Sequence, residues 1–201
     1  EATTGPLGQG IAMAVGMAIV EKHLAAKFNK RDNKIVNHYT YALCGDGCLQ
    51  EGVAQEAMSL AGRLALNKLI ILYDSNDIQL DGEVNKCNCE DMKKKMEAMG
   101  WHYQLVEDGN NCEDIAKAIK KAKKADKPAF IEVKTIIGYG TKGQGTNAVH
   151  GAPLPHDEVV EMREKLGTEP FTLPQEVYDY YQNTIVLRGH LEHLKWNRQV
   201  S

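Results

Sequence analysis

The segment Leu69–Tyr73 reads LIILY, an apolar run with no polar alternation. A strand with one face in water alternates apolar and polar side chains, so such a run is typical of a strand that is covered on both faces. Three further segments are rich in apolar, β-branched or aromatic residues and are predicted to be strands: Tyr39–Cys44, Trp101–Val106 and Ala129–Ile137. A sheet with a buried central strand constrains the rest of the chain, because helices must cover both of its faces.

Helical patterns lie between these predicted strands. Small and apolar residues dominate, or recur at helical spacing, in Leu7–Asn29, Glu51–Leu66, Asp91–Met99 and Cys112–Ala125. Strands that alternate with helices form right-handed βαβ units, in which the strands are parallel. The pattern therefore predicts an α/β fold: a doubly wound, mostly parallel sheet with helices on both faces.

Composition and charge exclude several classes of protein. The 201 residues are 43% hydrophobic and 25% charged, as in ordinary globular proteins, and the net charge of −3 does not indicate a nucleic-acid partner. No apolar run approaches the roughly 20 residues that cross a bilayer. The five cysteines fit neither a disulfide framework nor a zinc site, which indicates a reducing compartment. We expect a cytoplasmic protein with no nucleic-acid partner and no membrane partner.

The chain changes character after His150, where prolines become frequent and helices are predicted between about Asp157 and Trp196. No initiator Met is present, and Glu1 stands just before a glycine-rich segment. We interpret the chain as a piece of a longer protein. The expected organisation is a domain over residues 1–168, truncated at its N-terminus, followed by a helical linker over residues 169–201.

Unusual polar and glycine-rich segments follow the predicted strands. Gly45-Asp46-Gly47 follows the first strand, Asp74-Ser75-Asn76 the second, and a loop from Gly138 to His150 the last, while Gly5–Gly10 opens the first helix. Taken singly, each is more typical of a turn, a cap or a surface histidine. In an open parallel sheet, however, ligands bind beyond the carboxyl ends of the strands, and a helix N-terminus can meet an anion. Together these segments predict one binding site.

A diphosphate held through a divalent cation fits these residue types. Mg²⁺ prefers oxygen ligands and accepts few from the protein when phosphate oxygens are present. The Asp46 carboxylate, the Asn76 amide oxygen and the backbone carbonyl of Ile78 could supply them. Gly47 would let the diphosphate approach the backbone, and His150 could bind a phosphate oxygen or a substrate hydroxyl.

A nucleotide is the competing ligand. The segment Gly138–Gly143 spells G-x-G-x-x-G after a predicted strand. The dinucleotide fingerprint also requires a helix to begin there and an acidic residue about 20 positions later, whereas this loop continues and position 163 is Arg. No phosphate-binding G-x-x-x-x-G-K-[ST] loop is present, so both nucleotide interpretations are disfavoured.

The spacing of the GDG segment resembles a known cofactor motif. Gly45-Asp46-Gly47 followed by 28 residues and then Asn76 is similar to the thiamine diphosphate motif. The surrounding segments EATTGPLGQG, GDGCLQEGVAQEAMSLAGRLAL, IIGYG and VHGAPL resemble the diphosphate-binding domain of the transketolase family, up to about Pro170.

This resemblance implies a role for individual residues. The cofactors would be thiamine diphosphate and Mg²⁺, or Ca²⁺ or Mn²⁺ in its place. The implied metal ligands are Asp46, Asn76 and Ile78; the implied cofactor-binding residues are Gly5, Leu7, Gly45, Asp46, Gly47, Asn76 and His150; and the implied catalytic residues are His150 with Glu51 and Glu56. Glu51 and Glu56 match acidic residues at the subunit interface of the family.

The resemblance also implies an activity and partners. The family moves a two-carbon ketol unit from a ketose phosphate to an aldose phosphate in the pentose phosphate pathway, on a cofactor whose aminopyrimidine is bound by a Glu of the partner subunit's pyrimidine-binding domain. No segment here resembles that domain. We therefore expect sugar-phosphate substrates, a pyrimidine-binding domain or subunit as partner, and a homodimer or heterotetramer as the complete enzyme. The alternatives are a non-catalytic cofactor-binding or assembly module, and a close relative such as dihydroxyacetone synthase.

Overall fold

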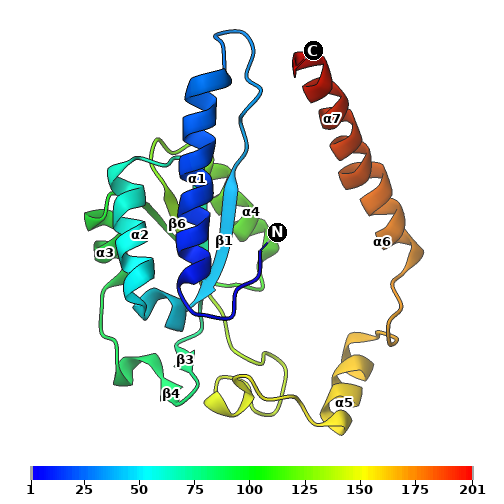
Figure 1. Ribbon diagram of the computed structural model, residues 1–201. Coiled ribbons are helices and arrows are strands. Elements are labelled where there is room, and N and C mark those ends of the chain that lie inside the picture. Colours follow the sequence, from blue (N-terminus) through cyan, green and yellow to red (C-terminus); the bar gives the residue numbers. More distant parts are fainter. Residues whose placement is uncertain (1, 201) are drawn as a thin grey trace. The chain divides into compact units, whose positions relative to one another are not determined.

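A computed structural model describes residues 2–200, and its centre is a sheet of four parallel strands (Figure 1). The strand order is β1-β2-β6-β5. These strands span Thr40–Gly45 (β1), Leu69–Ser75 (β2), Ala129–Lys134 (β6) and His102–Val106 (β5). The parallel pairing confirms the predicted α/β sheet.

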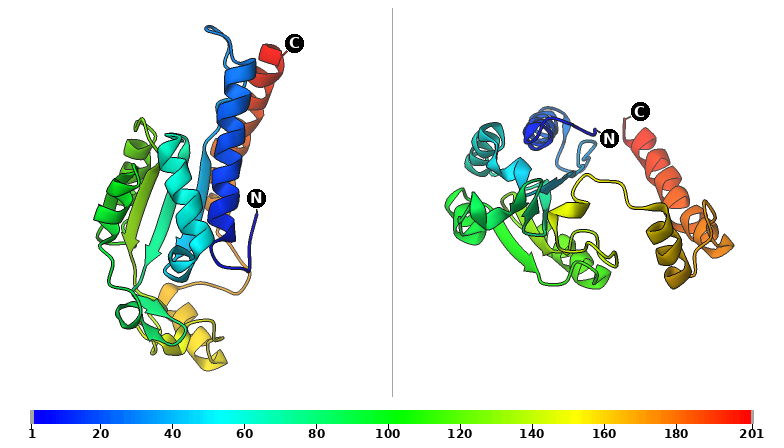
Figure 2. Two further views of the ribbon diagram at one scale, coloured as in Figure 1. Left: turned by 60° about the vertical axis from the view of Figure 1, so that its left-hand side comes forward. Right: turned by 90° about the horizontal axis from the view of Figure 1, so that it is seen from below.

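Helices cover both faces of this sheet. Helices α1 (Gln9–Phe28), α2 (Gly52–Arg63) and α3 (Met92–Ala98) contribute to one apolar core, and α4 (Cys112–Ala122) contributes to another. Figure 1 shows α1 and α2 in front of the sheet and α4 behind it, and Figure 2 gives two further views of the same layers. The predicted helices over residues 7–29, 51–66, 91–99 and 112–125 therefore form, with slightly shorter bounds.

Strand β2 is covered on both faces, as its apolar run predicts. Leu69, Ile71 and Tyr73 belong to the core beneath α1 and α2, whereas Ile70 belongs to the core beneath α4. Leu69, Ile70 and Ile71 have no exposed surface. Because only the ends of such a strand can carry polar groups without burying them, function is confined to its ends.

Strand β6 is shorter than the predicted segment 129–137, whose last three residues were wrongly assigned to the strand. Its pairing with β2 ends with Lys134 opposite Ser75, which is the last residue of β2. Since no partner strand continues past this point, the chain turns away, and only the Thr135 N–H still donates to the Ser75 carbonyl.

Shorter elements surround the carboxyl ends of the strands. A two-stranded antiparallel hairpin joins β3 (Ile78–Gln79) to β4 (Gly82–Glu83) directly after β2. The 3-10 helices are η1 (Gly47–Gln50), η2 (Val84–Lys86) and η3 (Asn147–Val149). Helices α3 and α4 begin at side-chain caps, since Asp91 accepts from the Lys94 N–H and Asn111 accepts from the N–H groups of Glu113 and Asp114.

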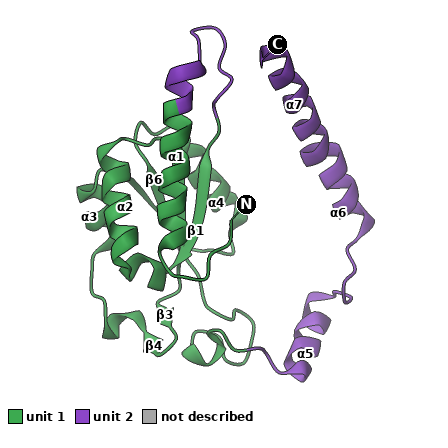
Figure 3. Ribbon diagram, in the orientation of Figure 1, with its two compact units in different colours: residues 1–23, 38–152 green, residues 24–37, 153–201 purple. Residues whose placement is uncertain are grey.

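The chain forms two compact units (Figure 3). The first comprises residues 1–23 and 38–152 and contains the sheet; the second comprises residues 24–37 and 153–201. The second unit includes α5 (His156–Leu166), α6 (Gln175–Tyr180), the π-helix η4 (Tyr181–Val186) and α7 (Leu187–Val200). These helices match the prediction of helices after residue 157, and the functional division at residue 168 stays a prediction. None of the helices within residues 2–200 combines the length and the apolar character needed to span a bilayer.

Alanine substitutions at two glycines, one in α1 and one in α2, test how these helices are packed. A Cβ at Gly62 in α2 would overlap the carbonyl oxygen of Met99, whereas a Cβ at Gly16 in α1 meets nothing within 4 Å. Gly62→Ala is therefore expected to lower the free energy of unfolding by at least about 2 kcal/mol through overpacking. Gly16→Ala should raise it by up to about 1 kcal/mol, because alanine favours a helix interior. Urea unfolding followed by circular dichroism measures both, and equal effects would contradict this packing.

Candidate functional site

A cleft of about 770 Å³ lies at the carboxyl ends of β1 and β2, within the roughly 300–1,000 Å³ typical of ligand sites. The hairpin β3–β4, the start of α2 and the segments around Leu7 and His150 complete its walls. Most of the residues predicted from the sequence line this cleft: Leu7, Gly45, Asp46, Gly47, Glu51, Asn76, Ile78 and His150. Gly5 and Glu56 are exposed and are not among its lining residues.

Asp46 has an incomplete set of hydrogen bonds. Its side chain is buried, and one carboxylate oxygen, Oδ1, accepts a hydrogen bond from the Tyr73 hydroxyl. The other oxygen, Oδ2, is buried without a partner. Asp46 occupies the N-cap position of η1 but makes no side-chain capping bond, so the ordinary role of an Asp in such a turn is not realised. Burial raises the pKa of Asp46, which makes its ionised form costly unless a cation is present.

Asn76 is held by hydrogen bonds on both sides of its amide. Its Oδ1 accepts from the Ile78 N–H at 3.0 Å, and its Nδ2 donates to Asp74 Oδ2 at 3.3 Å. The other Asp74 oxygen accepts from the Thr135 hydroxyl. Asp77 takes a left-handed conformation with φ 61°, which turns the chain between Asn76 and Ile78. An amide oxygen has two lone pairs, so Asn76 Oδ1 can accept one more partner.

These groups fit a hard divalent cation. The buried Asp46 oxygen without a partner, the remaining Asn76 lone pair and the backbone carbonyl of Ile78 are all oxygen donors of the kind Mg²⁺ accepts. Within residues 2–200, no group of three or more His, Cys, Asp and Glu side chains could hold a metal ion. An ion in this cleft would therefore need further oxygens from a ligand, as Mg²⁺ commonly takes from phosphates.

The glycine-rich loop lies directly against the start of α2. Gly8 has φ 76°, and a Cβ added to it would lie 2.7 Å from the Cβ of Glu51. A Cβ on Gly47 would lie 3.0 Å from Leu7 Cδ1. The loop therefore brings Leu7 beside the GDG segment and Glu51 to the rim of the cleft, although these residues are distant in the sequence.

His150, which also lines the cleft, has an unsatisfied ring nitrogen. Its ring Nδ1 is buried without a hydrogen-bond partner, and the residue ends the 3-10 helix η3. Gln79, on β3, likewise has a buried Nε2 without a partner. A ligand with oxygen acceptors could satisfy both nitrogens, because a neutral imidazole nitrogen and an amide N–H₂ can each donate.

Two features beside the cleft are not predicted from the sequence. The pattern marks Tyr73 only as an apolar strand residue, although a buried tyrosine hydroxyl usually needs a partner, and that requirement is a usable signal. The hairpin β3–β4 is not predicted either, despite the turn-forming pair Asp81-Gly82, of which Asp81 lies between the strands and Gly82 begins β4.

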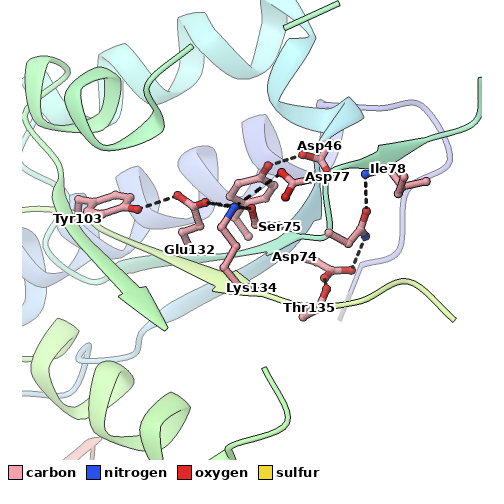
Figure 4. Close-up of polar contacts among 11 residues, drawn as sticks. Asp46, Asp74, Ser75, Asp77, Ile78, Tyr103, Glu132, Lys134 and Thr135 are labelled. Carbon is pink, nitrogen blue, oxygen red and sulfur yellow. Dashed lines mark hydrogen bonds and ion pairs between the residues drawn. The ribbon is translucent and has the colours of Figure 1, made fainter. Parts of the chain in front are cut away.

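A second buried carboxylate lies at the same edge of the sheet (Figure 4). Glu132 accepts from the Ser75 hydroxyl at 2.9 Å, from the Tyr103 hydroxyl at 2.8 Å, and pairs with Lys134 Nζ at 3.1 Å. Burial and this hydrogen bond raise the pKa of Tyr103. Burial alone would lower the pKa of Lys134, but Glu132 outweighs it and the pKa is raised. Glu132 borders a further cleft of about 590 Å³ and, unlike Asp46, has partners on both oxygens.

A family model and curated proteins match this chain. The model for "Transketolase, thiamine diphosphate binding domain" matches residues 1–201. A transketolase of Geobacillus stearothermophilus is 55% identical over 207 residues, which cover 100% of this chain and 31% of that protein. The chain therefore spans about 30% of the length of the curated relatives it matches.

Solved structures of transketolases also match the fold of this chain. Transketolase from Leishmania mexicana superposes with a TM-score of 0.94 at 45% identity, covering 98% of this chain and 30% of the other. A Pichia stipitis transketolase in complex with sedoheptulose-7-phosphate also reaches a TM-score of 0.94, at 42% identity and with the same coverage.

The raised pKa of Asp46 predicts a pH-dependent stability. Between the ordinary Asp pKa of about 3.9 and the higher value in the fold, the folded chain binds more protons than the unfolded chain. Without divalent ions, the contribution of Asp46 to the free energy of unfolding should therefore fall as pH rises through this window.

Asp46→Asn should lack this loss, because its amide cannot ionise yet keeps an oxygen for the Tyr73 hydroxyl. Its stability advantage over the wild type should therefore grow with pH. Urea unfolding at a series of pH values measures it, and a difference that does not vary with pH would contradict a raised Asp46 pKa.

Proposed function

The chain belongs to the transketolase family as its thiamine diphosphate-binding domain, and from this premise we propose that it holds Mg²⁺ and the cofactor's diphosphate in the cleft beyond β1 and β2. The observation that carries the proposal is Asp46 Oδ2, a buried carboxylate oxygen without a partner beside Asn76. A bound cation would supply the missing partner and offset the cost of burying the charge.

In this proposal each residue has a part in binding. Asp46, Asn76 and the Ile78 carbonyl would hold the ion, Gly45, Gly47 and His150 would bind the diphosphate, and Gly5 and Leu7 would contact the cofactor's ring system. When bound, thiamine diphosphate supplies an electron sink that allows a carbon–carbon bond to break. His150 Nδ1, which lacks a protein partner, hydrogen-bonds a phosphate oxygen or a substrate hydroxyl. The low exposure of Asp46 would keep water from competing with the ion for its carboxylate.

The complete enzyme transfers a two-carbon ketol unit from a ketose phosphate to an aldose phosphate. The solved Pichia stipitis relative in complex with sedoheptulose-7-phosphate supports a sugar phosphate as substrate. In this proposal the enzyme works in the cytoplasm, in the pentose phosphate pathway, and this chain needs a pyrimidine-binding domain or subunit to be active.

The outer faces of α1 and α2 support assembly with a second subunit. Met13, Met17 and Val20 lie on one face of α1 and are 39%, 46% and 53% exposed, and Val53 and Leu60 on α2 are similarly exposed. Neighbouring apolar side chains of this size on a protein surface mark interaction sites. In this proposal the faces join a dimer or heterotetramer, in which Glu51 and Glu56 belong to a network between paired sites.

A chimera tests the activity. The matching 31% of the Geobacillus stearothermophilus transketolase is replaced by this chain, and ketol transfer is assayed with ketose phosphate, aldose phosphate, Mg²⁺ and thiamine diphosphate. The chimera should be active and the chain alone inactive. Turnover by the chain alone would contradict the need for a second domain. An inactive chimera that still binds the cofactor would favour a non-catalytic binding module.

Asp46→Ala tests the ion site. It removes the only charged ligand, so Mg²⁺-dependent binding of thiamine diphosphate should weaken by more than roughly 100-fold, beyond the 10- to 100-fold cost of changing a group behind a metal ligand. Calorimetry measures the affinity with and without Mg²⁺. Asp108→Asn is the matched control, because Asp108 also follows a strand at this edge but its Oδ1 accepts from the Asn110 N–H at 2.9 Å and it lies outside the cleft. Unchanged affinity in Asp46→Ala would refute the assignment.

A further inference from the structure

Tyr73 lies directly behind the proposed ion site. Its side chain is 5% exposed, at the carboxyl end of β2, and its hydroxyl donates to Asp46 Oδ1. Tyr73 lies on the same strand and the same sheet face as Ser75. The Ser75 hydroxyl donates to Glu132, whose two carboxylate oxygens both have partners. The hydroxyl of Tyr73 is therefore the link between the apolar core and the incomplete carboxylate.

The ring of Tyr73 is held by an aromatic cluster. Its centroid lies 5.7 Å from that of Phe130, which in turn packs edge-on against Trp101 at 6.4 Å and stacks with Tyr103 at 6.5 Å. Trp101 is anchored by a hydrogen bond from its Nε1 to the Met58 carbonyl at 2.9 Å. Because closely packed aromatic rings cannot change rotamer without opening a cavity, the position of the Tyr73 hydroxyl is fixed.

This fixed hydroxyl decides how Asp46 is oriented. Asp46 precedes the 3-10 helix η1 with a helical backbone (φ −55°, ψ −48°), whereas a residue that caps a helix with its side chain usually has an extended backbone. No capping bond forms, and the carboxylate accepts a hydrogen bond from Tyr73 through Oδ1 and leaves Oδ2 without a partner. The hydrogen bond from Tyr73 therefore fixes which carboxylate oxygen remains for a cation.

We propose that Tyr73 is a positioning residue for the divalent-ion site: its hydroxyl holds Asp46 by Oδ1 and so leaves Oδ2 directed to the ion. The inference rests on the proposed function, since it requires that Asp46 binds the ion. It assigns Tyr73 no contact with the ion or the cofactor, because its hydroxyl already donates to Oδ1.

Tyr73→Phe tests this role, because it keeps the ring in the aromatic cluster and removes only the hydroxyl. The full chain is titrated with Mn²⁺ in the presence of thiamine diphosphate, and bound Mn²⁺ is followed by electron paramagnetic resonance. The affinity should fall about 10-fold or more, as for other groups that orient a metal ligand. The spectrum of the remaining bound Mn²⁺ should also change, which a loss of stability alone would not cause.

Tyr103→Phe is the matched control. It removes a tyrosine hydroxyl from the same cluster, but one that donates to Glu132 rather than to Asp46. Its Mn²⁺ affinity and spectrum should equal those of the wild type. Equal weakening in both variants would overturn the inference, since the effect would then come from the aromatic packing.

The remaining outcomes separate the inference from the function on which it rests. If the wild type binds Mn²⁺ and Tyr73→Phe binds it equally with the same spectrum, the inference fails and the proposed ion site stands. If the wild type binds no Mn²⁺, both fail.

If circular dichroism shows that Tyr73→Phe does not fold, nuclear magnetic resonance of the wild type replaces the Mn²⁺ titration of this variant. The Tyr73 hydroxyl proton should stay protected from exchange when Mg²⁺ and thiamine diphosphate are added. Its loss on binding would overturn the inference.

Discussion

The burial of β2 on both faces is the constraint on which the rest of the structure depends. Because Leu69, Ile70 and Ile71 have no exposed surface, the strand can carry polar groups only at its ends. Parallel pairing then brings the ends of β1, β2 and β6 to one edge, where Gly45 lies opposite Asp74 and Ser75 opposite Lys134. The polar chemistry of the first compact unit is concentrated there by the same packing that stabilises the sheet.

Two buried carboxylates at this edge, Glu132 and Asp46, differ in whether other groups of the fold compensate their charge. Glu132 has hydroxyl groups and an ammonium on its oxygens, so its charge is compensated within the fold. Asp46 has one hydroxyl on one oxygen and nothing on the other. An uncompensated buried charge destabilises the folded chain, and its persistence is understandable where a ligand completes it. The proposed function therefore accounts for Asp46, whereas Glu132 needs no ligand.

The pattern of apolar and polar residues predicted the fold well, because strand burial, helix period and helix caps depend on residues that are close in the sequence. It also predicted that Asp46, Asn76 and His150 would share an edge, since that follows from parallel topology. The pairing of Tyr73 with Asp46 was not predictable in this way, because it joins residues 27 apart through side chains. The end of β6 depends on where its partner strand stops, and the exposed positions of Gly5 and Glu56 depend on packing around them. Their roles stay predictions from the family resemblance.

In the proposed site, one ion joins the Asp46 carboxylate to the cofactor's diphosphate. Pulsed electron–nuclear double resonance of Mn²⁺ bound to the wild-type chain with thiamine diphosphate tests it directly, when aspartate carboxylates carry carbon-13. We expect the bound Mn²⁺ to couple to the phosphorus nuclei of the diphosphate and to an aspartate carboxylate in the same spectrum. Phosphorus coupling without any carboxylate coupling would contradict it.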